Sequence, residues 1–163
     1  MTYNDPYGWE GSEAIGSGID NQNSLIKNLT GISNVFTLTY ENSADTGFEV
    51  RPVKAGHLYM ITKNTACDTV TVNIRGSEYT YKDLKKGGTI IDLGYATPED
   101  VIVVSADTSM NASVYTLETS RFKEAFNILN NNSLNVSEFT NNKIKGTVNA
   151  DKDATLIYSI PYD

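Results

Sequence analysis

Apolar and polar residues alternate along most of the chain, with a period of two. The clearest case is residues 69–76, where valines and an isoleucine alternate with threonines and an asparagine. This pattern predicts a strand with one buried and one solvated face. A turn at Gly76-Ser77 and the run over residues 78–82 predict the second strand of a hairpin.

Other short strand patterns recur, separated by residues typical of turns. In the first of them, Phe36, Leu38 and Tyr40 are expected on one face. The predicted strands cover residues 35–40, 47–53, 56–63, 89–94, 101–105, 112–118, 134–139, 143–149 and 154–160.

Two segments follow the helical period instead. Residues 21–30 allow a short helix that Gly31 would end. Residues 122–129 place apolar side chains at i, i+3, i+4 and i+7, which predicts an amphipathic helix with Ser120 as its N-cap. The remaining residues at the start of the chain, 1–20, are rich in glycine and acids and predict a loop.

These elements predict a mostly β fold, a jelly-roll or galactose-binding-like β-sandwich with one or two short helices. Three parts are expected along the chain. Residues 1–33 form an N-terminal loop and short helix, and residues 34–119 form the sandwich core. Residues 120–163 supply a helix and C-terminal strands that complete or extend the sandwich.

Composition narrows the class of protein. The chain has 163 residues, 39% of them hydrophobic, which is enough for a folded core. Its formal net charge of −7 argues against nucleic-acid binding, because phosphate recognition needs clustered lysine and arginine. The densest basic group, Lys82, Lys85 and Lys86, adjoins a Gly-Gly turn and is best read as a solvated loop.

The single cysteine, Cys67, excludes an internal disulfide and is expected to be a structural or incidental thiol. No apolar run approaches the roughly 20 residues that span a bilayer. The first residues have neither the basic nor the apolar region of a signal peptide. The chain as given is therefore expected to be soluble.

Three segments resemble the YfhO-like bacterial membrane proteins, in the order of that family. Residues 22–36 contain its Q-N, L-T-G and V-F pattern, and residues 122–129 resemble its helix. Residues 144–150 and 156–163 resemble its I-x-G-x-V strand and its S-I-P-Y-D strand. In the family a Gly-Trp pair and a hairpin follow, so we expect Asp163 to mark an excision point within a larger parent.

The resemblance implies a parent with many transmembrane helices, similar to glycosyltransferases that use lipid-linked sugars and modify cell-envelope polymers. This chain would be an accessory domain on the extracytoplasmic face of the bacterial cell membrane, without chemistry of its own. Its partners would be the parent's membrane helices and, as a further candidate, a cell-envelope glycan.

The sequence contains no clear motif for a catalytic or a metal-binding site. His57 is the one histidine, at the start of a strand and without a nucleophile motif, and is expected to be half-exposed. Asp151 and Asp153 form an acidic turn with too few carboxylates for a calcium loop. No catalytic, cofactor or metal site is predicted. The sequence cannot select among the acids that could form a glycosidase pair: Glu10, Glu13, Asp92, Glu99 and Asp100.

Aromatic residues leave one binding hypothesis open. Tyr3, Tyr7 and Trp9 gather in a polar N-terminal segment, and sugars stack their apolar faces on such rings. The alternative is that these rings pack the loop onto the sheet. If they contact sugar, the chain would be a carbohydrate-binding module of a cell-surface protein.

Overall fold

The protein is described here from a computed structural model that covers residues 18–63, 66–84, 89–131, 133–140 and 143–148. The chain divides into two compact units, residues 1–125 and residues 126–163. Each unit is described by itself.

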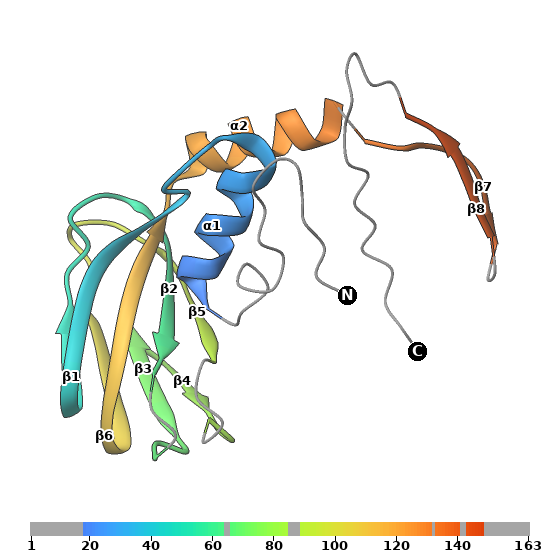
Figure 1. Ribbon diagram of the computed structural model, residues 1–163. Coiled ribbons are helices and arrows are strands. Elements are labelled where there is room, and N and C mark those ends of the chain that lie inside the picture. Colours follow the sequence, from blue (N-terminus) through green and yellow to red (C-terminus); the bar gives the residue numbers. More distant parts are fainter. Residues whose placement is uncertain (1–17, 64–65, 85–88, 132, 141–142, 149–163) are drawn as a thin grey trace. The chain divides into compact units, whose positions relative to one another are not determined.

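The first helix of the described residues, α1 (Ile19–Thr30), is followed in the first unit by antiparallel strands (Figure 1). A second helix, α2 (Thr119–Asn131), starts in the first unit and ends in the second. The strands described in the first unit are β1 (Phe36–Val50), β2 (Gly56–Thr62), β3 (Val70–Ile74), β4 (Ser77–Tyr81), β5 (Ile90–Ala96) and β6 (Ile102–Leu117).

Two long strands, β1 and β6, organise this unit. They pair along most of their lengths, from Phe36 opposite Leu117 to Val50 opposite Ile102. The other edge of β6 is shared, because β3 pairs with residues 102–106 and β2 with residues 112–116. β4 then pairs with β3, and β5 with β2. The result is two half-sheets that have β1 and β6 in common.

The two half-sheets meet at a bend in β1 and β6. The register shifts between Asn42 and Asp45 and again between Asp45 and Gly47, where residues 105–110 of β6 lie opposite. Such bulges bend strands and let them pass from one sheet to another. Gly47 belongs at this bend because an added Cβ would lie 3.2 Å from the Val104 carbonyl oxygen.

This bend corrects the prediction of separate strands at residues 35–40 and 47–53. Residues 36–40 and 47–50 belong to the single strand β1, and residues 101–105 and 112–118 likewise fall mainly in β6. The polar residues between them remain in strand conformation at the bend, where most side chains face solvent. A polar stretch interrupts the apolar alternation at the bend, so the sequence pattern at the bend resembles that of a loop.

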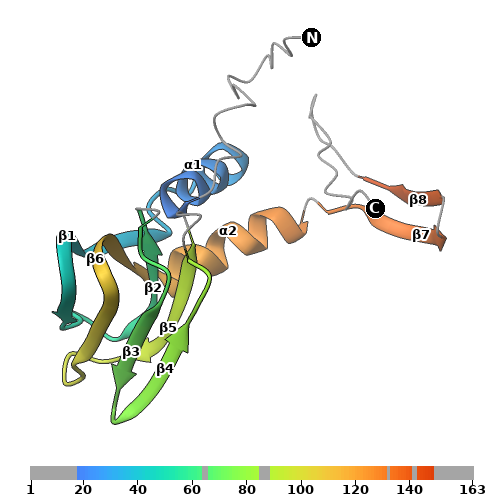
Figure 2. The same ribbon diagram turned by 90° about the horizontal axis from the view of Figure 1, so that it is seen from below.

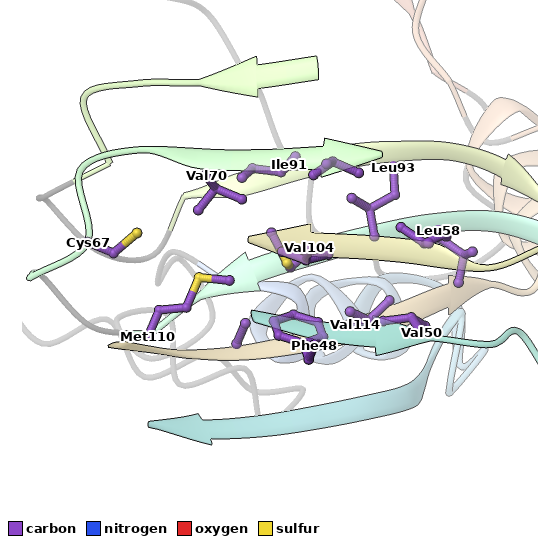
Figure 3. Packing of buried hydrophobic residues seen from close by; sticks show 14 of the residues in the cluster. Phe48, Val50, Leu58, Cys67, Val70, Ile91, Leu93, Val104, Met110 and Val114 are labelled. Atoms are coloured by element: carbon purple, nitrogen blue, oxygen red, sulfur yellow. The ribbon is translucent and has the colours of Figure 1, made fainter. Parts of the chain in front are cut away.

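The faces of the two half-sheets that point toward each other enclose the main core (Figure 3). This arrangement confirms the prediction of a mostly β, sandwich-like fold. The finer jelly-roll or galactose-binding-like topology stays a prediction. The buried core side chains are Phe48, Val50, Leu58, Met60, Cys67, Val70, Val72, Leu84, Ile91, Leu93, Ala96, Ile102, Val104, Met110, Ala112 and Val114.

A smaller cluster lies on the other face of the sheet, under α1. Ile19 of the helix packs with Ile61 and Tyr115 of the strands, and Phe36 and Tyr59 lie against them. The Tyr115 hydroxyl also donates to both carboxylate oxygens of Asp20 in α1, at 3.3 Å. The outer face of β2 and β6 is thereby covered near the first turns of the helix.

The expectation that Phe36, Leu38 and Tyr40 share a face is wrong. β1 has an extra residue between Leu38 and Tyr40 relative to β6, and this bulge reverses the direction of the following side chains. Tyr40 therefore packs on the main core, with its ring stacked on Phe48 at 5.1 Å. Leu38 is 55% exposed.

The predicted helix at residues 21–30 is confirmed as α1, and Gly31 ends it. Gly31 has a φ of 77°, and its N–H donates to the Lys27 carbonyl oxygen at 2.7 Å. The second helix begins at a different residue from the one predicted. α2 begins at Thr119 and the Phe122 N–H donates to the Glu118 carbonyl oxygen, so Ser120 lies in the first turn and is not the N-cap.

The predicted hairpin is also present, with its turn one residue earlier than expected. β3 and β4 pair from Val70 opposite Tyr81 to Ile74 opposite Ser77. The turn residues are Arg75 and Gly76, with φ values of 50° and 77°. Positive φ at both central positions is the geometry that closes two-residue hairpins.

The second unit contains a two-stranded hairpin of β7 (Asn135–Thr140) and β8 (Lys143–Thr147). Both strands correspond to predicted ones, residues 134–139 and 143–149. The predicted strand at residues 154–160 lies outside the described residues. The division at residues 34 and 120, and the idea that the last strands complete the sandwich, stay predictions.

Candidate functional site

A groove lies between the two half-sheets where their outer strands, β4 and β5, face each other. In both views β1 and β6 lie on one side of the first unit and β4 and β5 on the opposite side (Figure 2). β1 and β6 hold the half-sheets together on their side, whereas β4 and β5 are not paired with each other. The groove has a volume of about 520 Å³.

Apolar side chains and tyrosines line the groove. Val72, Ile74 and Leu93 continue the core surface into it. Tyr79 and Tyr81 line the β4 side; they follow the alternation of the hairpin, in which Tyr79 lies opposite Val72. Tyr79 is 52% exposed, so much of its ring is in contact with water.

The β5 side contributes backbone groups and polar side chains. The Tyr81 hydroxyl donates to the Asp92 carbonyl oxygen at 3.2 Å, which links β4 to β5 across the groove. Gly94 has a φ of 79° at a bulge in the β2–β5 pairing, and Tyr95 beyond it is 57% exposed. Tyr95 is paired with His57, so its side chain shares the face of His57 and Asp92, away from the main core.

Asp92 borders the groove, but its side chain lies on the other face of this half-sheet, because Asp92 is paired with Tyr59 and bonds to His57 there. Its Oδ1 accepts a hydrogen bond from the Gly94 N–H at 2.7 Å and lies 2.7 Å from Nε2 of His57. Burial, and secondarily the Asp92 charge, raise the pKa of both Tyr81 and Tyr59. The phenols therefore keep their protons at neutral pH and can donate hydrogen bonds.

Arg75 is in the groove lining, but its guanidinium group forms an ion pair with Asp100. Nε and Nη2 donate to the two carboxylate oxygens at 2.8 and 2.6 Å, a bidentate pair. Asp100 also accepts from the Thr97 N–H at 2.7 Å. Hydrogen bonds from Arg75, and then from Thr97, hold the pKa of Asp100 well below its usual range. The positive charge in the groove is thus largely neutralised.

The structure separates the acids that the sequence proposed as candidates. Asp92 bonds to His57 on the outer face of β2 and β5, Asp100 bonds to Arg75, and Glu99 is an exposed residue of a turn. His57 has a side-chain exposure of 36%, as expected of a half-exposed strand residue, and stacks on Tyr59 at 5.1 Å. Cys67 is fully buried. Glu10, Glu13, Asp151, Asp153, Lys85 and Lys86 lie outside the described residues.

The N-terminal aromatic residues Tyr3, Tyr7 and Trp9 also lie outside the described residues. Three tyrosines that border the groove were not predicted from the sequence: Tyr79, Tyr81 and Tyr95. The available signal was the Tyr79-Thr80-Tyr81 alternation in the second strand of a tight hairpin, which puts both rings on the core face. Within the described residues, no group of three or more potential metal ligands gathers.

The fold is an antiparallel β-sandwich-like domain with a groove lined in part by tyrosines. The sequence model of the family described as Bacterial membrane protein YfhO matches residues 17–163. The chain therefore belongs to this family, as the resemblance predicted. No curated protein and no solved structure matches the chain. Neither helix in the described residues is long and apolar enough to cross a membrane.

The first segment of the resemblance forms the corner between α1 and β1. The Asn23 side chain donates to the Phe36 carbonyl oxygen at 2.7 Å and accepts from the Phe36 N–H at 2.8 Å. The Thr30 hydroxyl accepts from the Ile32 N–H at 3.1 Å, and Val35 is fully buried. The Q-N, L-T-G and V-F residues therefore fix how the helix leads into the sheet.

Proposed function

We propose that this chain is an extracytoplasmic accessory domain of a polytopic membrane protein that resembles lipid-linked-sugar glycosyltransferases. In this proposal the domain has no chemistry of its own and holds or positions a cell-envelope glycan near the parent's membrane helices.

The observation that carries the proposal is an open aromatic groove on a self-contained core, in a member of a membrane-protein family. Residues 36–117 form the strands around this core, so the domain has its own folding unit. A rigid scaffold with a lined groove suits recognition of a ligand. The buried thiol of Cys67 is also compatible with an oxidising compartment, since it is sheltered from oxidants.

A second candidate is a carbohydrate-binding module of a cell-surface protein. The same groove favours it, because exposed tyrosines next to polar groups suit sugars in either setting. The two functions differ in what the domain serves, a membrane-embedded transferase or a surface protein that adheres to glycan.

Cysteine labelling in the full-length parent tests the membrane side. Val53 is 86% exposed between β1 and β2, away from the groove lining, so Val53→Cys offers a reactive thiol. We expect a membrane-impermeant maleimide to label this cysteine in intact bacterial cells. The native Cys67 provides an internal control because it should stay unlabelled until the protein is denatured.

Labelling that needs cell lysis would contradict the extracytoplasmic location. A positive control with a membrane-permeant maleimide shows that the thiol is reactive in both cases. Full-length parent with the residue 18–148 region deleted should keep its membrane insertion but lose efficient transfer to the envelope polymer. Unchanged transfer would contradict an accessory role in that reaction.

A further inference from the structure

We propose that the outer edge of β8 is a docking site for a later segment of the same chain, residues 154–160. This segment would pair with β8 as an antiparallel strand and widen the β7–β8 hairpin into a sheet of three strands with one apolar face. Within the described residues β8 pairs with β7 alone, so its other edge offers backbone groups to a further strand.

The β7–β8 hairpin presents an apolar face to solvent. Phe139 lies opposite Ile144 on this face. Val136 lies opposite Gly146, two residues from Ile144, and therefore points the same way. Phe139 is 75% exposed and Val136 is 54% exposed. A two-stranded hairpin is marginally stable at best in water, and a further strand with a shared apolar face stabilises it.

The other face of the hairpin is charged and has partners of its own. Glu138 forms ion pairs with Lys143 and Lys145, whose Nζ atoms lie 3.2 and 3.3 Å from its carboxylate oxygens. A strand beside β8 is therefore expected to place its larger apolar side chains on the face of Ile144 and not on the face of the lysines.

The chain after β8 has the length and the pattern of such a strand. In residues 154–160 apolar side chains alternate, with Leu156, Tyr158 and Ile160 on one face. Residues 149–153, which include the predicted acidic turn, can form the connection. Five residues are within the usual length of a hairpin loop.

This connection sets the register of the proposed strand. With residues 149–153 as the loop, Tyr158 lies opposite Ile144 and extends the apolar face. Ile157 then lies opposite Lys145 on the charged face. Consecutive strands joined by a short loop usually pair with each other, which favours the edge of β8 over that of β7.

Disulfide trapping in the full 163-residue chain tests the pairing and its register. Opposed residues of antiparallel strands have Cα atoms about 4.5–5.5 Å apart, within the reach of a disulfide. Lys145→Cys/Ile157→Cys should therefore form an intramolecular disulfide under mild oxidation, identified by peptide mass mapping. The matched control is Lys145→Cys/Tyr158→Cys, which should stay reduced because the two side chains would point to opposite faces.

Hydrogen exchange followed by NMR tests the same strand without new cysteines. Amides of β8 and of residues 155–159 should exchange about fivefold more slowly in the native chain than in Tyr158→Asn, which removes the contact with Ile144. Ile157→Asn changes the neighbouring residue on the charged face and should keep most of the protection.

Several outcomes would overturn the proposal. A disulfide between two chains, in place of the intramolecular one, would assign this edge to a second copy. Protection that appears only with added phosphatidylglycerol vesicles would assign the apolar face to a lipid surface. Equal trapping of both cysteine pairs, or unprotected amides at residues 155–159, would contradict the strand and its register. None of these outcomes bears on the labelling of Val53→Cys or on glycan binding by the groove.

Discussion

Cys67 illustrates how burial decides the chemistry of a single residue. The thiol is fully buried and donates to the Thr69 carbonyl oxygen at 3.5 Å. Burial, and then the nearby Asp107, raise the pKa of the Cys67 thiol to about 11. The sequence suggested a structural thiol from the lack of partners, but it could not show that the side chain belongs to the main core.

Native Cys67 is therefore expected to resist thiol reagents. At a pH of about 8 roughly one thiol in a thousand would be ionised, and the thiolate is the reactive form. A colorimetric disulfide reagent should give no signal with the folded chain and one equivalent in denaturant. Rapid reaction of the native chain would contradict the burial of this side chain.

The Arg75–Asp100 pair predicts a pH dependence of stability. The pKa of Asp100 is lowered from its ordinary value of 3.8 by Arg75, and then by Thr97. Because the pKa is lower in the folded chain, the stabilisation is complete above the ordinary value and is lost as the pH falls below it. Asp100→Asn should lower the urea midpoint at a pH of about 7 and reduce its further decline toward a pH of about 2.5.

Glu99→Gln is the matched control, since Glu99 is an exposed neighbour in the same turn. It should leave both the midpoint and its pH dependence close to those of the native chain. An acid decline in Asp100→Asn as steep as in the native chain would contradict the role of this pair.

At the scale of elements, local patterns predicted most helices and strands but not their junctions. The helix of residues 21–30 and the β3–β4 hairpin followed from periodicity and from Gly31 and Gly76. The continuity of β1 and β6 could not be predicted, because bulges and polar residues at the bend break the alternation. The reversal of side-chain direction between Leu38 and Tyr40 could not be predicted for the same reason, because it depends on a bulge.

The corner between α1 and β1 depends on Asn23, whose amide forms two hydrogen bonds with the Phe36 backbone. Asn23→Ala should lower the free energy of unfolding by about 1–3 kcal/mol, because it leaves two backbone groups without these partners. Asn28→Ala makes the same substitution at an exposed position of the same helix and controls for helix propensity. Equal urea midpoints for the two variants would contradict the role of Asn23.

At the scale of the whole molecule, the sequence predicted a β-sandwich and a YfhO-like family, and its aromatic candidates lie outside the described residues and stay a prediction. Tyr3, Tyr7 and Trp9 stood out because they are adjacent in sequence. The groove has other tyrosines on its inner face, Tyr79 and Tyr81, which lie opposite Val72 and Val70. The groove itself depends on the bend in β1 and β6, which no local pattern reveals.

The most direct measurement of the central claim is a two-dimensional NMR titration of the full chain with N-acetylchitotetraose, a soluble glycan probe. The account predicts that the largest shifts fall on the backbone amides of Tyr79, Asp92, Gly94 and Tyr95 and saturate together. Amides of β7 and β8 should stay unchanged. Saturating shifts confined to residues outside the groove, or none at any soluble concentration, would contradict the claim that this groove is where the domain meets a glycan.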